Sequence, residues 1–278
     1  MIQHRPWLFS RTPSMLLVLL SAPVWLTTGC AAPVKAAKPI LLKEVEPRYQ
    51  KEARSIQADP VGYLKKLEER CATLPQYQLV FYRQEKLGQL QPMEKMNAKF
   101  RRDPFSVKFE WDDPNANYAE SVYVHGENDG KLLVRERKGV LFLPPAVRVV
   151  APDFSVKIGK SKNPITNFGL ANMVRSSLGP ITDPDIADQI VFNYRGVVEL
   201  DPTGSPAHYL EVLRPVTKHW IHARQDVYID ADTLLPAGVD LWNKDESLDA
   251  RYRYARIDTE PFLTDADFRL SQGHPKFD

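Results

Sequence analysis

The chain has 278 residues, of which 43% are hydrophobic and 26% charged, a composition typical of soluble globular proteins. A chain of this length buries a sizeable core without disulfides or metals, and its formal charge of +2 excludes the strongly basic surface on which nucleic-acid binding depends. The two cysteines, Cys30 and Cys71, are too few for a disulfide framework or a zinc site made of thiolates alone. The 23 prolines, against 13 glycines, favour short strands and turns over long helices.

The N-terminus has the pattern of a secretory signal. His4, Arg5 and Arg11 form a basic leader, and residues 15–26 are a mostly apolar run. This run is shorter than the roughly 20 apolar residues that a membrane-spanning helix needs. We therefore expect the first thirty residues to direct export.

The apolar run ends in LTTGC, residues 26–30, which resembles the lipobox of bacterial lipoproteins. The resemblance implies that residues 1–29 are a lipoprotein signal peptide and that Cys30 is acylated and anchors the mature chain in a membrane. Ordinary cleavage after Ala36, which would leave a soluble secreted protein, is the alternative. Removing residues 1–29 takes away Arg5 and Arg11 and no acidic residue, so the mature chain is formally neutral and its membrane attachment would come from the lipid.

The mature chain begins with a stretch rich in alanine, proline and lysine, which predicts a flexible tether over residues 30–45 and one folded domain over residues 46–278. A helix is expected from Pro60, with Asp59 as its N-cap and an apolar face that includes Cys71. A lone cysteine on such a face is read as a buried small hydrophobe and not as a nucleophile.

After Pro75 the apolar residues alternate with polar ones, which is typical of strands. The clearest strand is 105–111, with one face expected to be buried and the other, which carries Lys108, expected to face solvent. The turn-rich segments between the strands imply consecutive antiparallel pairing. Further strands are expected at 77–82, 121–125, 131–137, 140–143, 190–200, 209–213, 221–229, 235–242 and 250–257.

One helix interrupts the strands. Residues 164–179 carry a single apolar stripe, with Thr166 expected as the N-cap and Gly179 as the end of the helix. The helix must bury this stripe, and the apolar face of the sheet is the available surface. The stripe consists of Leu170, Met173, Val174 and Leu178.

No motif for catalysis, metal or cofactor binding is found. The nucleophile elbow G-x-S-x-G and glycine-rich phosphate loops are absent. His219 and His222, three residues apart on a predicted strand, would point to opposite faces and so could not share a metal. We therefore predict no catalytic residue, no metal site and no cofactor.

Aromatic residues recur on alternate positions of the predicted strands. They can form an ordinary closed core, or they can line a hydrophobic groove suited to an acyl chain, and both interpretations remain open at this point. The residues that carry this pattern include Phe105, Phe109, Trp111, Tyr123, Trp220 and Trp242.

Four strings together resemble a known family: YRQEKLGQL at 82–90, AKFRRDPFSVKFEW at 98–111, NPITNFGLANMV at 163–174 and YRYARIDTEPFLTDADF at 252–268. They are similar to an uncharacterised bacterial family of exported proteins, a domain of unknown function, over roughly residues 60–278. The arrangement also resembles the superfamily of periplasmic lipoprotein carriers and receptors of the Lol type. That resemblance implies an α+β, mainly antiparallel fold in which a curved sheet or incomplete β-barrel has helices packed on or plugging its concave face.

The resemblance also implies a function. We expect a non-enzymatic, lipid-anchored envelope protein that binds an acyl chain, lipid or lipoprotein as a carrier, receptor or chaperone. The residue after Cys30 is Ala31 and not the aspartate that often retains lipoproteins at the inner membrane, so we expect the outer membrane, facing the periplasm. The alternatives are an envelope scaffold that binds a protein partner without a ligand cavity, and a hydrolase with a dispersed site.

The expected ligand site combines two sources. The resemblance places Phe105, Phe109 and Trp111 on a wall strand and Phe168, Leu170 and Met173 on a lid helix, and the aromatic alternation adds three residues. These three are Tyr123, Trp220 and Trp242.

Overall fold

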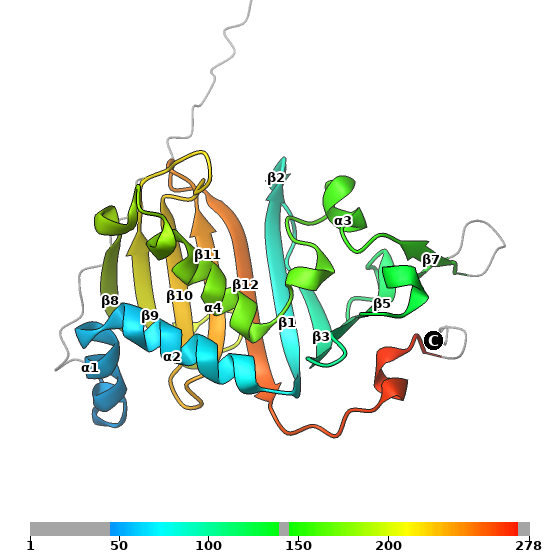
Figure 1. The fold of residues 1–278 in the computed structure, drawn as a ribbon, viewed down its shortest axis with the longest axis horizontal. Coiled ribbons are helices and arrows are strands. Elements are labelled where there is room, and N and C mark those ends of the chain that lie inside the picture. The colour runs from blue at the N-terminus through cyan, green and yellow to red at the C-terminus, as the bar shows by residue number, and fades with distance from the viewer. Residues whose placement is uncertain (1–44, 139–144, 272–278) are drawn as a thin grey trace, which may run out of the picture. The chain divides into compact units, whose positions relative to one another are not determined.

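The first and last strands of the described chain pair with each other and join two meanders into one antiparallel sheet. The computed structural model describes residues 45–138 and 145–271 (Figure 1). The strand order is β7-β6-β5-β4-β3-β1-β12-β11-β10-β9-β8, with the short β2 paired to β1. The end strands β7 and β8 pair with no further strand in the described part, so the sheet stays open, and the expected mainly antiparallel α+β class is confirmed.

The strands are β1 (Gln76–Leu87), β2 (Gln89–Leu90), β3 (Glu94–Arg101), β4 (Ser106–Trp111), β5 (Tyr118–Val124), β6 (Leu132–Glu136), β7 (Val147–Val150), β8 (Val191–Leu200), β9 (Ser205–Leu213), β10 (Arg224–Asp230), β11 (Pro236–Trp242) and β12 (Leu248–Asp258). The α-helices are α1 (Gln50–Ala58), α2 (Pro60–Thr73), α3 (Phe154–Lys157) and α4 (Leu170–Leu178). In Figure 1, α2 and α4 lie across the face of the sheet formed by β8–β12.

Most strand predictions are confirmed, with shifts at their ends. The strand expected at 221–229 begins only at Arg224, so His219 and His222 lie in the connection between β9 and β10 and not on a strand. The reason is a tight turn in which Thr217 both donates its amide to the carbonyl of Trp220 and accepts two amide protons on its hydroxyl. Strands β2, β3 and β7 were not anticipated, and the strand expected at 140–143 lies outside the described residues.

Helix α2 begins as expected. Asp59 accepts a hydrogen bond from the Gly62 amide at 2.8 Å, and Pro60 occupies the first turn, where its missing amide costs nothing. A Cβ on Gly62 would lie 2.0 Å from the Asp59 carboxylate, so the cap itself requires glycine here. Cys71 is buried, as the sequence indicated, and burial raises the pKa of its thiol to about 11.

Helix α4 is shorter than expected, and Thr166 does not cap it. Residues Ile165–Asn167 form a 3-10 turn, and Gly169, at φ +142°, separates this turn from the helix that begins at Leu170. The Leu170 amide donates instead to the Tyr77 hydroxyl on β1, at 2.9 Å. The cap is therefore a tertiary contact, although the predicted apolar stripe is buried as expected.

The second face of β4 is buried and not solvated. Lys108 is buried because the C-terminal segment crosses this face, where Phe268 packs against Val122 and Val124 of β5. The Lys108 ammonium lies 3.2 Å from the Glu120 carboxylate, which also accepts the Ser271 amide. A buried charge is tolerated here because it is paired.

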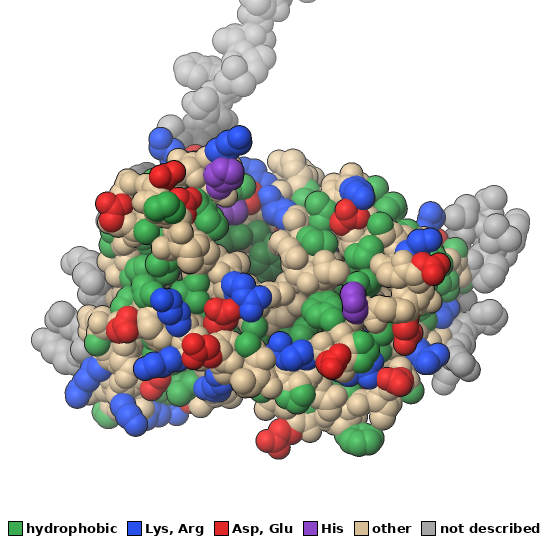
Figure 2. Space-filling model, in the orientation of Figure 1, with side chains coloured by type: hydrophobic (Ala, Val, Ile, Leu, Met, Phe, Trp, Pro, Cys, Tyr) green, Lys and Arg blue, Asp and Glu red, His purple; other side chains and the backbone are tan. Residues whose placement is uncertain are grey.

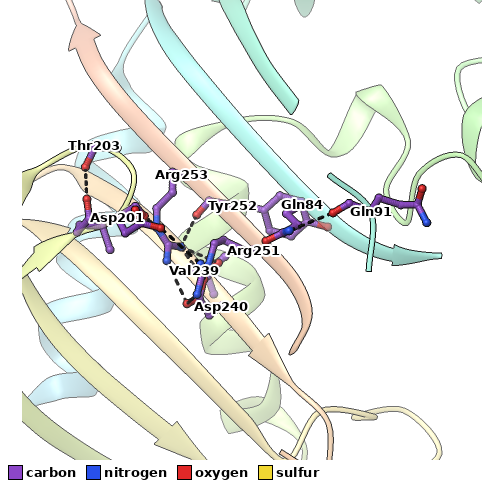
Figure 3. A network of polar contacts seen from close by, with 10 residues as sticks. Gln84, Gln91, Asp201, Thr203, Val239, Asp240, Arg251, Tyr252 and Arg253 are labelled. Atoms are coloured by element: carbon purple, nitrogen blue, oxygen red, sulfur yellow. Dashed lines mark hydrogen bonds and ion pairs between the residues drawn. The ribbon is translucent and has the colours of Figure 1, made fainter. Parts of the chain in front are cut away.

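Charged side chains are also buried on the β11–β12 part of the sheet. The Arg253 guanidinium makes two hydrogen bonds to Asp240, at 2.6 and 3.0 Å, and a third to the Asp201 carbonyl (Figure 3). Arg251 also reaches Asp240. A Cβ on Gly238 would lie 2.5 Å from the Tyr252 carbonyl oxygen, so glycine gives Arg253 the room to lie flat over β11.

The 3-10 turn Pro47–Tyr49, which precedes α1, covers a buried histidine. The Tyr49 ring packs edge-on against His208, with ring centroids 6.0 Å apart, and the Tyr194 hydroxyl lies 2.8 Å from His208 Nδ1. Burial lowers the pKa of His208, because the charged imidazolium would lose its hydration there. Among the described residues, no helix is long and apolar enough to span a membrane.

Replacing Phe268 tests the C-terminal packing. Phe268 is 2% exposed, so we expect Phe268→Ala to lower the free energy of unfolding by about 3 kcal/mol in urea denaturation. The control is Phe262→Ala, since Phe262 is 91% exposed and its loss should change stability by less than about 0.5 kcal/mol. Equal effects of the two variants would contradict the packing role.

His208 predicts a pH dependence of stability. Because its pKa is lowered in the folded state, the unfolded chain binds the proton more readily, so this contribution is present above about pH 6.5 and is lost as the pH falls below it. Urea unfolding at a series of pH values measures it. We expect His208→Gln to reduce the pH dependence and His125→Gln, at an exposed position, to leave it unchanged.

Candidate functional site

A cavity of about 550 Å³ lies between the sheet and the segments around α3 and α4. Figure 2 shows a hollow on this side of the molecule with hydrophobic side chains at its floor and basic side chains beside it. The apolar lining consists of Phe81, Phe109, Trp111, Tyr118, Leu132, Val134, Val150, Phe154, Pro164, Ile165, Phe168, Met173, Val239, Leu241, Tyr252 and Tyr254. The polar lining consists of Arg83, Glu85, Glu94, Asn117, Ser121, Arg148, Ser155, Lys160, Ser161, Asn163, Asn167, Asn172, Arg175 and Ser176.

Aromatic rings form the apolar part of the cavity. Phe168 packs edge-on against Phe109 and Phe81, with centroid distances of 4.8 and 5.2 Å. Phe81 in turn packs against Tyr254 at 5.2 Å. The register explains this meeting, because Phe81 of β1 lies directly opposite Tyr254 of β12. Edge-on aromatic contacts of this kind fix ring positions while leaving apolar faces for a ligand.

The next residues of the same strand face give the cavity a polar end. Arg83 donates to Glu94 at 2.9 Å and to the Ser161 hydroxyl at 3.1 Å. Burial alone would lower the pKa of Arg83, but the carboxylates of Glu94 and Glu85 outweigh it and hold the pKa above its ordinary value. Glu94 also accepts from the Trp111 indole at 3.2 Å, so this pair connects the polar and aromatic parts of the lining.

Glu85, which is buried, fastens the connecting segment to the sheet. It accepts the Tyr252 hydroxyl at 2.6 Å and the Lys162 amide at 3.1 Å. The Asn163 amide group donates to the same Tyr252 hydroxyl at 2.9 Å. The pKa of Tyr252 is raised well above its ordinary value, mainly by burial and also by the neighbouring Glu85 carboxylate. The hydroxyl therefore keeps its proton and remains a hydrogen-bond donor to Glu85. We call residues 160–168 the strap; it crosses the cavity between α3 and α4.

The structure places four of the nine predicted ligand residues in the cavity wall: Phe109, Trp111, Phe168 and Met173. Phe105 and Tyr123 pack against each other next to the wall, with their ring centroids 6.1 Å apart. Leu170, the first residue of α4, is fully buried. Trp220 donates to Asp183 at 2.7 Å, and Trp242 donates to Asp226 at 2.7 Å. These five do not line the cavity, and Cys30 lies outside the described residues.

Sequence reasoning missed the polar end of the site. Arg83 and Glu85 follow Tyr77, Leu79 and Phe81 at intervals of two, on the face of β1 that is otherwise apolar. Charged residues that continue an apolar strand face are the signal that could have identified them. Tyr252 and Tyr254 alternate in the same way on β12 and are not among the nine predicted ligand residues.

In the described part of the chain, no three His, Cys, Asp or Glu side chains are grouped so that they could hold a metal ion. His222 lies 2.8 Å from Asp249, which also accepts from Lys162 at 3.0 Å. Burial would raise the pKa of Asp249, but the hydrogen bonds from His222 and Lys162 lower it below its ordinary value.

Removing one hydroxyl tests the strap attachment. Tyr252→Phe leaves the buried Glu85 without its closest donor, so we expect the free energy of unfolding to fall by about 1–3 kcal/mol and the Lys162 amide to exchange with solvent faster. Tyr82→Phe is the matched control, because Tyr82 occupies the opposite face of β1 and its hydroxyl makes no hydrogen bond with a described residue. Unchanged exchange at Lys162 in Tyr252→Phe would contradict this role of Glu85.

Comparison with solved structures gives matches of low similarity. The chain is similar to MucB in the Pseudomonas aeruginosa MucA/MucB complex (17% identity, TM-score 0.43, 77% of this chain and 61% of that chain). It is also similar to the Mycobacterium tuberculosis lipoprotein LppX (13%, 0.36, 74% and 98%) and to a LolA superfamily protein from Nitrosomonas europaea (8%, 0.27, 75% and 96%). The chain spans less than two thirds of the MucB chains that it matches.

A search of curated protein sequences finds no match. One family model matches, and it covers residues 74–277, from the start of β1 through the C-terminal segment. The chain therefore belongs to the family of proteins of unknown function called DUF1571.

Proposed function

We propose that this protein is a non-enzymatic binding protein of the bacterial cell envelope that holds an acyl chain, a lipid or an acylated protein in the cavity. The observation that carries the proposal is the cavity of about 550 Å³, one part of which is lined by aromatic and aliphatic side chains such as Phe81, Phe109 and Phe168. Cavities of roughly 300–1,000 Å³ with mostly apolar linings are typical of small-molecule sites.

Burial of methylene groups supplies the affinity in this proposal. Each buried methylene contributes about 0.8 kcal/mol, so a long acyl chain binds without any charged contact. The polar lining supports this interpretation, since Arg83, Glu85 and Glu94 already bond to partners within the protein. A ligand that fills the aromatic part therefore does not need to satisfy them.

The N-terminal region extends the proposal. Residues 1–29 act as a lipoprotein signal peptide, Cys30 carries the acyl anchor, and residues 30–45 tether the domain of residues 46–278 to the membrane. The anchor holds the protein in the outer membrane, facing the periplasm. Globomycin, which blocks signal cleavage of lipoproteins, should lead to accumulation of the uncleaved precursor, and Cys30→Ala should abolish labelling by an alkyne fatty acid. Unchanged processing and labelling would favour the soluble secreted form.

Native mass spectrometry tests the cavity directly. The described core is built from residues between Val45 and Phe268, so a protein that begins at Ala31 keeps all of it and lacks the anchor. Expressed in the periplasm, this protein should carry a lipid or acylated adduct near one-to-one. A folded protein that has no adduct and takes up no fluorescent fatty acid would contradict the proposal, and binding of a protein partner would then be the alternative.

Two neighbouring residues of the edge strand β7 give a matched pair of variants. Val150 lines the cavity, whereas Val149 is 56% exposed and lies on the other side of the strand. A carboxylate in the apolar wall carries a desolvation cost, so we expect Val150→Glu to weaken uptake of the fluorescent fatty acid by about tenfold or more. Val149→Glu should leave uptake unchanged, and equal effects of both variants would argue against the cavity as the site.

A further inference from the structure

Two segments at one end of the sheet carry four of the nine large hydrophobic residues that are exposed in the described part of the chain. Val156 and Ile158 belong to residues 154–162, around α3, and Val216 and Ile221 belong to residues 214–223, the connection between β9 and β10. These four side chains are between 36% and 56% exposed. Exposed apolar groups that cluster in this way mark an interaction site more often than isolated ones do.

The same two segments are basic. Neither contains an aspartate or glutamate, although the whole chain has 35 acidic residues. Together they carry four lysines, which are Lys157, Lys160, Lys162 and Lys218, and one buried arginine, Arg214, which bonds inside the fold to Gln225. Four acidic side chains outside the segments contact them: Asp153 pairs with Lys157, Asp249 with Lys162 and His222, Asp183 with the Trp220 indole, and Glu85 accepts the Lys162 amide. Lys160 and Lys218 are exposed and form no ion pair with any described residue, so they are the positive charges that the segments present to a partner.

The structure brings the two segments together at the cavity. Asp249, at the start of β12, accepts both Lys162 from one segment and His222 from the other, at 3.0 and 2.8 Å. Phe154, Lys160 and Ser161 of the first segment line the cavity. In Figure 1, α3 and the yellow β9–β10 connection lie at the same end of the sheet, and Figure 2 shows basic and histidine side chains beside the hollow.

The β9–β10 connection is held in place. The Thr217 hydroxyl accepts the amides of His219 and Trp220, and the Trp220 ring fills the space beside Gly179, where a Cβ would lie 2.9 Å from it. Lys218 and Ile221 are therefore presented outward from a fixed turn.

We propose that these two segments form a docking face for a membrane surface that contains anionic lipid. The apolar side chains enter the interfacial region while the lysines contact the negative headgroups, a combination typical of peripheral membrane binding. The face adjoins the cavity, so a lipid can pass between membrane and cavity without crossing water. That consequence rests on the proposed function, whereas docking itself does not.

Vesicle sedimentation tests the face, with the protein that begins at Ala31 so that no anchor contributes. We expect binding to vesicles of equal parts phosphatidylglycerol and phosphatidylcholine, weak binding to pure phosphatidylcholine, and loss of binding at high salt. Lys218→Glu should lower the vesicle partition coefficient about fivefold or more, which corresponds to ~1 kcal/mol for each basic residue near an anionic surface. Ile221→Ser and Ile158→Ser should lower it about tenfold each.

The controls lie away from both segments, on α1 and in the segment after β12. Lys51→Glu and Phe262→Ser change exposed residues of the same types and should leave vesicle binding unchanged. Uptake of the fluorescent fatty acid, measured without vesicles, should survive Lys218→Glu and Ile221→Ser, so failure of docking and failure of the cavity are separate results. No preference for phosphatidylglycerol, or equal losses in the control variants, would overturn the proposal. Binding to neither vesicle would overturn it too, in favour of a protein as the occupant of the face.

Discussion

The pairing of β1 with β12 is the constraint on which the rest of the structure depends. These strands are the first and last long strands of the described chain, and their register sets Phe81 opposite Tyr254 and Arg83 opposite Tyr252. The same register that joins the two meanders therefore assembles both the aromatic and the polar part of the cavity. If the pairing shifted by one residue, all of these side chains would turn to the other face of the sheet, because side chains alternate between the two faces along a strand. The register therefore determines which residues form the cavity.

The cavity exists because the helices cover the sheet unequally. Helices α2 and α4 lie over the β8–β12 part, where their apolar stripes are buried, whereas the strap and α3 face the part that includes β4–β7. The strap is fastened at one end by Ser161 and Lys162, which bond to Arg83 and Glu85, and beyond its other end by the Leu170 amide on Tyr77. Between these polar contacts, Phe168 of the strap packs on Phe81 and Phe109, so the strap forms one wall of the cavity.

Local sequence rules predicted the elements better than the site. Alternation identified β4 and β12, and the Asp59-Pro60 cap identified α2, because in each case the deciding interactions lie within a few residues. Thr166 failed as a cap because a distant tyrosine satisfies the helix start, and Lys108 is buried because a segment more than 150 residues later covers it. The cavity lining depends on sheet curvature and on where Phe168 meets Phe81, and neither is encoded locally.

Charged side chains are arranged differently on strands β11–β12 and at the cavity end of the molecule, and this difference bears on function. At β11–β12 the buried Arg253 and Asp240 bond to each other, so their charges are compensated inside the fold and present nothing to a partner. At the cavity end, Lys160 and Lys218 are exposed beside apolar side chains in a chain whose total charge is close to zero. Positive charge that is local in this way attracts an anionic surface to one end of the molecule only. Docking would then orient the protein with its cavity toward the membrane, which is the geometry that transfer of an insoluble ligand requires.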